Sequence, residues 1–152
     1  MPLSSRLAAL LPALWAGWML CVGLLATPAP FATLATADAG RVVARMLAQE
    51  AYTALALGVI LLLLERSRAR RTASEQQGSL FSVEVALCLG TLFCTVAGYF
   101  AVQPMMASAR AGQGPLSFGQ LHAVSAAFFV VKGLLVLLLA WRSADALRPR
   151  AS

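Results

Sequence analysis

The sequence predicts an all-α integral membrane protein, with one domain over residues 1–152 folded as a four-helix bundle. Its residues are 60% hydrophobic and only 12% charged, whereas a soluble domain has roughly 45–50% apolar and about 25% charged residues. The apolar residues also gather in four long stretches, and no segment alternates between apolar and polar residues as a half-buried strand does. This composition excludes a soluble enzyme domain, a disordered tail and a nucleic-acid-binding protein.

The four apolar stretches predict helices over residues 7–27, 44–64, 80–102 and 118–141. Each contains the roughly 20 residues that a helix needs to cross a bilayer. The first ends just before Pro28 and Pro30, and helices tend to end before proline. Because its apolar run exceeds the roughly 7–15 residues of a signal-peptide core, we expect it to remain as a span. We expect Asp38 to cap the second helix, and residues 65–79 and 103–117 to form loops.

The basic residues predict the orientation in the membrane. With four spans, both termini and the central loop lie on one side, which carries eight arginines: Arg6, Arg66, Arg68, Arg70, Arg71, Arg142, Arg148 and Arg150. The other side carries three: Arg41, Arg45 and Arg110. Cytoplasmic segments carry the excess of basic residues. We therefore expect a multi-pass protein of a bacterial inner membrane with the N and C termini cytoplasmic.

Polar residues near the outer ends of the second and fourth helices predict a binding cluster. Glu50 and His122 fall in the outer third of their spans, and Arg45 and Tyr52 lie close to Glu50 in the sequence. Ionisable groups inside a span cost roughly 2.5–3.5 kcal/mol each, so their presence carries information. We expect Glu50 to pair with His122 or Arg45, and the cluster to bind a small solute, an ion or a lipid headgroup.

A second set of polar residues predicts pairing deeper in the membrane, where we expect Glu84 to meet Lys132. His122, Ser125, Phe129 and Lys132 follow helical spacing and share one inward face of the fourth helix. The third helix has a similar stripe, formed by Glu84, Cys88, Thr91, Thr95 and Gly98. The polar residues of the second helix predict that its outer half faces the bundle. Strips of small residues favour close helix packing. Two such strips are present: Ala9, Ala13, Gly17 and Cys21 on the first helix, and Gly90, Cys94 and Gly98 on the third.

The sequence predicts no cofactor, no metal site and no enzymatic activity. It has one histidine, which is too few for a bis-histidine haem site. Cys21, Cys88 and Cys94 lie in apolar segments without a CxxC motif, so we interpret them as packing residues. Methionines and cysteines that suit copper(I) are present, but they lack a repeated spacing.

Several short motifs occur in an order that resembles a known family. They are Leu14-Trp-Ala-Gly-Trp18, Thr27-Pro-Ala-Pro-Phe31, Ala39-Gly-Arg41 and Leu121-His122 with Ser125. Together they resemble the bacterial membrane family of unknown function (DUF4149) that is related to transmembrane protein 205. The resemblance extends over nearly the whole chain. It implies a four-helix integral membrane domain and no established reaction.

Two functional hypotheses remain at this point. In the first, the polar cluster binds a small solute, ion or lipid headgroup, or helps to move it, and transport would require an oligomer. In the second, the protein is a structural or assembly subunit whose polar stripes pair with another copy or with another membrane protein. The intramembrane polar residues fit both hypotheses, because such groups also hold helices together by hydrogen bonds.

Overall fold

The computed structural model describes residues 3–74 and 81–145, and within these ranges the chain is helical with short connections and no strand. The elements are α1 (Leu3–Leu20), η1 (Cys21–Ala26), η2 (Ala29–Ala32), α2 (Thr36–Ser74), α3 (Val83–Thr95), η3 (Val96–Ala101), α4 (Val102–Arg110) and α5 (Phe118–Asp145). They form four long apolar helices, each long enough to cross a membrane. The predicted number of spans is therefore confirmed.

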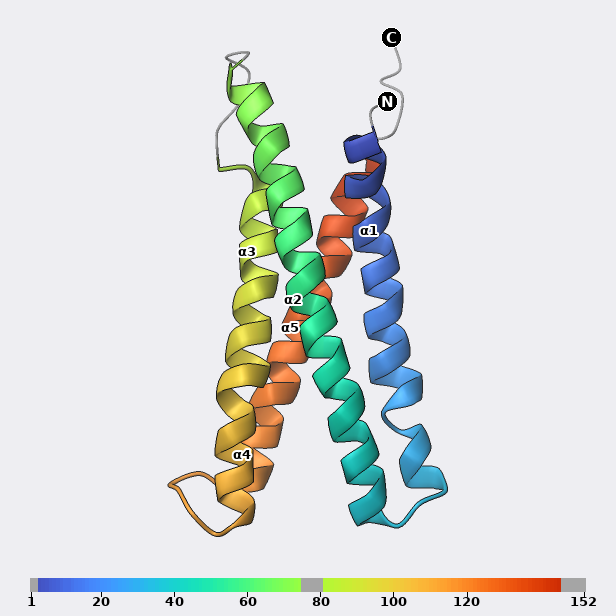
Figure 1. The fold of residues 1–152 in the computed structure, drawn as a ribbon, viewed down its shortest axis with the longest axis vertical. Helices are drawn as coiled ribbons and strands as arrows, with labels where there is room; N and C mark the ends of the chain where they lie inside the picture. The colour runs from blue at the N-terminus through green and yellow to red at the C-terminus, as the bar shows by residue number, and fades with distance from the viewer. Residues whose placement is uncertain (1–2, 75–80, 146–152) are drawn as a thin grey trace.

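The four helices form a ring that alternates in direction. α1 packs against α2 and α5, and α3 packs against the same two helices, so α2 and α5 lie across the bundle from each other. In Figure 1, the start of α1 and the end of α5 lie at the top, where α2 ends and α3 begins. The connections from η2 to α2 and from α4 to α5 lie at the opposite end, which we call the loop end.

The first span changes its helical form before it reaches the loop end. α1 continues into the π-helical segment η1, which ends at Ala26, and Pro28 and Pro30 then start the short 3-10 helix η2. The Thr27 hydroxyl donates a hydrogen bond to the carbonyl of Gly23 at 3.0 Å. The end of the long helix before Pro28 was predicted and is confirmed.

α2 is much longer than predicted and runs for 39 residues from Thr36 to Ser74. At 1.5 Å per residue, it exceeds the roughly 30 Å of a bilayer core at both ends. Asp38 lies inside its first turn and pairs with Arg41, so the predicted capping role is wrong. A carboxylate in the first turn still stabilises the helix through the helix dipole. At the other end, Glu65 and Arg68 form an ion pair one turn apart, at 3.0 Å.

The third span is also longer than predicted, because α3, η3 and α4 form one continuous helix from Val83 to Arg110. Ser82 caps its start, and the Ser82 hydroxyl accepts a hydrogen bond from the backbone N–H of Val85 at 3.3 Å. Pro104 lies in the first turn of α4, directly after the π-helical turn η3. Proline is tolerated there because the hydrogen-bond ladder already shifts at such a turn. The predicted loop over 103–117 is therefore wrong as far as Arg110.

The true connection at this point is a tight turn that leads into a capped helix. Gly112 and Gly114 have φ angles of 71° and 99°, a conformation that favours glycine. Ser117 and Gln120 then form a capping box. The Ser117 hydroxyl accepts a hydrogen bond from the backbone N–H of Gln120 at 3.3 Å, and the side-chain oxygen of Gln120 accepts one from the backbone N–H of Ser117 at 2.9 Å. These local signals fix the start of α5 at Phe118, as predicted.

An apolar core fills the half of the bundle away from the loop end. It includes Trp15 and Met19 of α1, Leu61 of α2, and Val136 and Leu139 of α5. The packing strip predicted on the first span is wrong, since Ala13, Gly17 and Cys21 are exposed. The span instead buries another face, which includes Ala8, Pro12, Trp15, Ala16 and Met19 of α1 and Val22 of η1. On the third span, the predicted strip is confirmed. Added side chains at Gly90 and Gly98 would press on Leu135 and Phe128 of α5.

Candidate functional site

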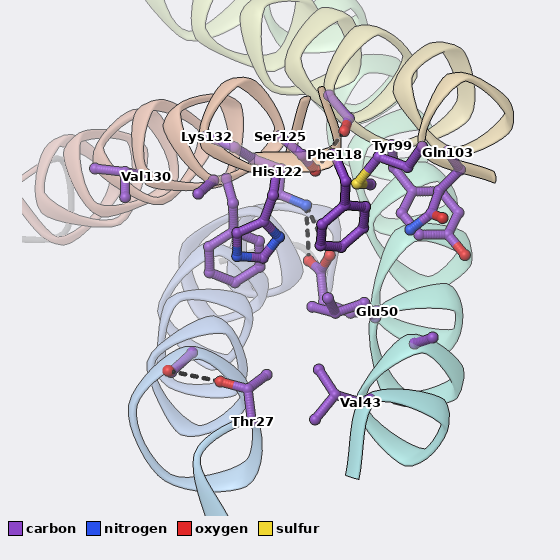
Figure 2. A pocket seen from close by; sticks show the side chains of 18 of the residues that line it. Thr27, Val43, Glu50, Tyr99, Gln103, Phe118, His122, Ser125, Val130 and Lys132 are labelled. Atoms are coloured by element: carbon purple, nitrogen blue, oxygen red, sulfur yellow. Dashed lines mark hydrogen bonds and ion pairs between the residues drawn. The ribbon is translucent and has the colours of Figure 1, made fainter. Parts of the chain in front are cut away.

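A cleft of about 680 Å³ lies in the half of the bundle nearest the loop end. Its walls come from η1 and η2, the first half of α2, the end of α3, η3 and α4, and the first half of α5. Most of the lining is apolar, and the polar groups are few, as in small-molecule sites of roughly 300–1,000 Å³. Figure 2 shows this cleft, with dashed lines joining the side chains of Glu50 and Lys132.

The most buried charges of the cleft are the ion pair between Glu50 of α2 and Lys132 of α5. The Lys132 Nζ atom lies 2.8 Å from both carboxylate oxygens of Glu50. The side chain of Glu50 is 3% exposed and that of Lys132 is 4% exposed. Nζ also lies 5.1 Å from the centre of the Phe129 ring, within the distance of a cation–π contact. The pair joins two helices that do not adjoin in the ring.

The sequence-based pairing of Glu50 with His122 or Arg45 is therefore wrong, and the reason is depth. The prediction measured depth from the start of the apolar stretch at residue 44. Because α2 begins at Thr36 and α5 at Phe118, Glu50 and Lys132 lie the same number of residues into their helices. Both helices start at the loop end, so these two side chains reach the same level.

Glu84 lies at the other end of the bundle and does not meet Lys132, so that predicted pair is also wrong. Glu84 is in the first turn of α3, and it pairs with Arg142 in the last turn of α5 at 2.7 Å. Both side chains are partly exposed, at 24% for Glu84 and 42% for Arg142. Neither residue of this pair lines the cleft.

The inward stripe of α5 is confirmed, since all four of its predicted members line the cleft. The Ser125 hydroxyl donates a 2.7 Å hydrogen bond to the carbonyl of Gly98, so it links α5 to the third span. The His122 ring stacks on Phe118 with a centroid separation of 5.9 Å. Figure 2 shows both rings among the side chains that line the cleft. On the third span, Thr95 and Gly98 of the predicted stripe also line the cleft.

Arg45 and Tyr52 do not belong to the cleft, so the predicted outer cluster is only partly correct. Tyr52 is 64% exposed and packs edge to face on Phe100 at 5.4 Å. Arg45 is exposed as well. On a helix with 3.6 residues per turn, positions two residues apart point to opposite sides. When Glu50 faces the cleft, Tyr52 must therefore face outward.

The structure adds four cleft residues of the third span that the sequence analysis missed: Tyr99, Gln103, Met106 and Arg110. The Arg110 guanidinium lies 4.5 Å from the centre of the Phe118 ring. These residues repeat every three or four positions, which is a helical stripe. Pro104 and the nearby glycines led to a loop prediction, and the stripe was the signal that argued against it.

The residues of the cleft do not form a metal centre. Across residues 3–74 and 81–145, no three His, Cys, Asp or Glu side chains gather as a metal site requires. The three cysteines are unbonded, with Cys88 and Cys94 buried and Cys21 exposed. Cys94 alone among them lines the cleft.

A model of one protein family, described as a domain of unknown function (DUF4149), matches residues 10–115. The chain belongs to this family. The match covers three of the four spans and includes Glu50, Gly98 and Arg110, whereas His122, Ser125 and Lys132 of α5 lie beyond it. No curated protein and no solved structure matches the DUF4149 chain.

Proposed function

We propose that this DUF4149 protein is a membrane-embedded binding module that holds one small amphipathic molecule in its cleft. The observation that carries the proposal is an apolar cleft with a buried, fully paired charge cluster in its wall. Ligand sites in proteins combine such apolar walls with a few fixed polar groups. The Glu50–Lys132 pair supplies those groups without leaving a net charge in the membrane.

The proposal favours binding over conduction through a pore. Between the ion pair and the far end of the bundle, the interior is filled by Trp15, Leu61, Val136 and Leu139, all at most 1% exposed. Ions and polar solutes need a polar path, because unpaired charges in an apolar interior are costly. These apolar side chains therefore close the cleft beyond the Glu50–Lys132 pair. The proposal includes no enzymatic activity.

The proposed orientation places the cleft on the outer side of a bacterial inner membrane. It follows from the arginines near both termini and in the central loop. A reporter enzyme that works only in the cytoplasm is expected to be active when fused at Ser74 or Ser152 and inactive at Gly112. Activity at Gly112 with none at Ser74 would reverse the proposed topology.

A glycine at the entrance of the cleft allows a direct test of binding. Gly40 lines the cleft, and a Cβ atom built there meets no other atom within 4 Å. Gly40→Leu is therefore expected to keep the fold, because leucine is the better helix former, and to fill part of the cleft. The matched control is Gly17→Leu, since Gly17 has the same open space on the outer face of α1.

The readout is native mass spectrometry of protein extracted in a mild detergent. We expect a small amphipathic molecule to co-purify with the wild type and with Gly17→Leu, and at least tenfold less of it with Gly40→Leu, a loss that corresponds to about 1.4 kcal/mol. Equal amounts of the co-purifying molecule on all three proteins would contradict binding in the cleft.

The second candidate function is that of an assembly subunit, and the exposed face of α1 favours it. Ala13 and Gly17 of α1 and Cys21 of η1 are exposed at four-residue spacing, and small residues let membrane helices approach closely. Under this hypothesis a second copy or another membrane protein packs on that face. Gly17→Leu would then abolish the complex that chemical cross-linking detects in membranes, whereas Gly40→Leu would leave it intact.

A further inference from the structure

A second hollow of about 360 Å³ adjoins the cleft at the loop end. It is lined by the first turns of α2 and the end of α4: Thr36, Ala37, Gly40, Arg41, Ala44 and Arg110. Four of these residues, Thr36, Gly40, Ala44 and Arg110, also line the cleft. The hollow is therefore the entrance to the cleft, and we call it the entrance hollow.

Two arginines line the entrance hollow, whereas the buried charges of the cleft, Glu50 and Lys132, balance each other. Arg41 and Arg110 both line the entrance hollow. Arg110 stacks on Phe118 and forms no ion pair within residues 3–74 and 81–145. Arg41 pairs with Asp38 on the surface, where the two side chains are 76% and 51% exposed. Such exposed pairs are weak and exchange readily for a better partner.

The cleft between the arginines and the ion pair is mostly apolar, and its polar side chains there include Gln103, His122 and Ser125. Val43 and Leu47 of α2, Met106 of α4 and Phe129 of α5 line it. A molecule in this site therefore meets cationic groups first, then a mostly apolar stretch with a few polar side chains, and finally a charge pair that is already satisfied. This order matches a molecule with an anionic head and an apolar chain.

We infer that the cleft binds an anionic amphiphile with a single apolar chain. Its phosphate or carboxylate head lies between Arg41 and Arg110, and its chain extends toward the Glu50–Lys132 pair. Guanidinium groups suit such heads because they donate paired hydrogen bonds to two oxygens at once. This inference rests on the proposed function and adds the charge of the ligand to it.

The test compares two lipids that share a chain and differ in the charge of the head. The probes are oleoyl lysophosphatidic acid, oleoyl lysophosphatidylcholine and inorganic phosphate, each titrated onto the purified full chain in a maltoside detergent. Binding is measured by native mass spectrometry. The protein variants are Arg41→Gln combined with Arg110→Gln, and Arg45→Gln as the matched control. Arg45 is an exposed arginine of α2 that lines neither the cleft nor the entrance hollow.

We expect lysophosphatidic acid to bind the wild type and Arg45→Gln at least tenfold more tightly than lysophosphatidylcholine, because charge-assisted hydrogen bonds are the stronger ones. The double variant should lose this preference, and Gly40→Leu should weaken binding of both lipids. Equal binding of both lipids to the wild type, with loss on Gly40→Leu, would overturn the anionic head and leave the proposed function intact. Binding of neither lipid would overturn both. Equally tight binding of inorganic phosphate would overturn the need for a chain.

Discussion

Replacing Lys132 by methionine is expected to destabilise the protein by about 3–5 kcal/mol, the typical cost of breaking a buried ion pair on one side. The substitution keeps an unbranched side chain of similar length and removes only the charge and the donors. Glu50, whose side chain is 3% exposed, would lose both hydrogen bonds to Nζ. Its carboxylate would then remain unpaired inside the bundle, which costs free energy of folding.

The double variant Glu50→Leu with Lys132→Met should recover most of that loss. Replacing both members of a buried pair by apolar residues is often neutral or stabilising, because neither charge then has to leave water. The matched control is Arg142→Met, which breaks the partly exposed pair with Glu84. Its expected cost is about 0–1 kcal/mol, as for other solvent-exposed pairs.

The measurement is the free energy of unfolding in mixed micelles as the fraction of a denaturing detergent rises. A loss for Lys132→Met no larger than that for Arg142→Met would mean that Glu50 and Lys132 do not form a buried pair. The double variant also separates stability from function. If it folds well but no longer retains the amphipathic ligand, the pair contributes to binding as well as to packing.

The spans could be predicted from the sequence because lipid imposes a long apolar stretch on every helix that crosses it. The same signal misplaces helix ends, since it reports where a helix contacts lipid and not where its hydrogen bonds stop. Residues 36–43 include the charged Asp38 and Arg41, and residues 65–74 are mostly polar, yet both segments belong to α2 in the structure. This error at the start of α2 shifted the predicted depth of Glu50 and thereby hid its partner Lys132.

The inward face of α5 could be predicted because its polar and aromatic residues repeat with the helical period, and all four line the cleft. The packing face of α1 could not be predicted from the sequence. Ala13 and Gly17 are as acceptable against lipid as against a helix, so their spacing does not show which face is buried. The structure buries Trp15 instead, which reaches toward Gly58 of α2. A large side chain beside a distant glycine is a tertiary match that no local pattern contains.

Gly98→Ala is expected to cost about 1–3 kcal/mol or more, the range for overpacking a well-packed interior. An added Cβ at Gly98 would overlap the Cβ of Phe128. Every residue except glycine carries that atom, and no rotamer change moves it, so the helix backbones must separate. Their separation would also lengthen the 2.7 Å hydrogen bond from Ser125 to the Gly98 carbonyl, and it would deform the wall of the cleft at Thr95 and Gly98.

The control for this prediction is Gly17→Ala, where the new Cβ meets no atom within 4 Å. That substitution should be neutral or stabilise by up to about 1 kcal/mol, because alanine is the better helix former. Thermal unfolding of both variants in the same detergent measures the difference. Equal stability of Gly98→Ala and Gly17→Ala would show that the third span and α5 do not approach as closely as described. A selective loss for Gly98→Ala would instead establish the contact that forms this wall, because of these two positions only Gly98 has a helix close enough for a methyl group to push it away.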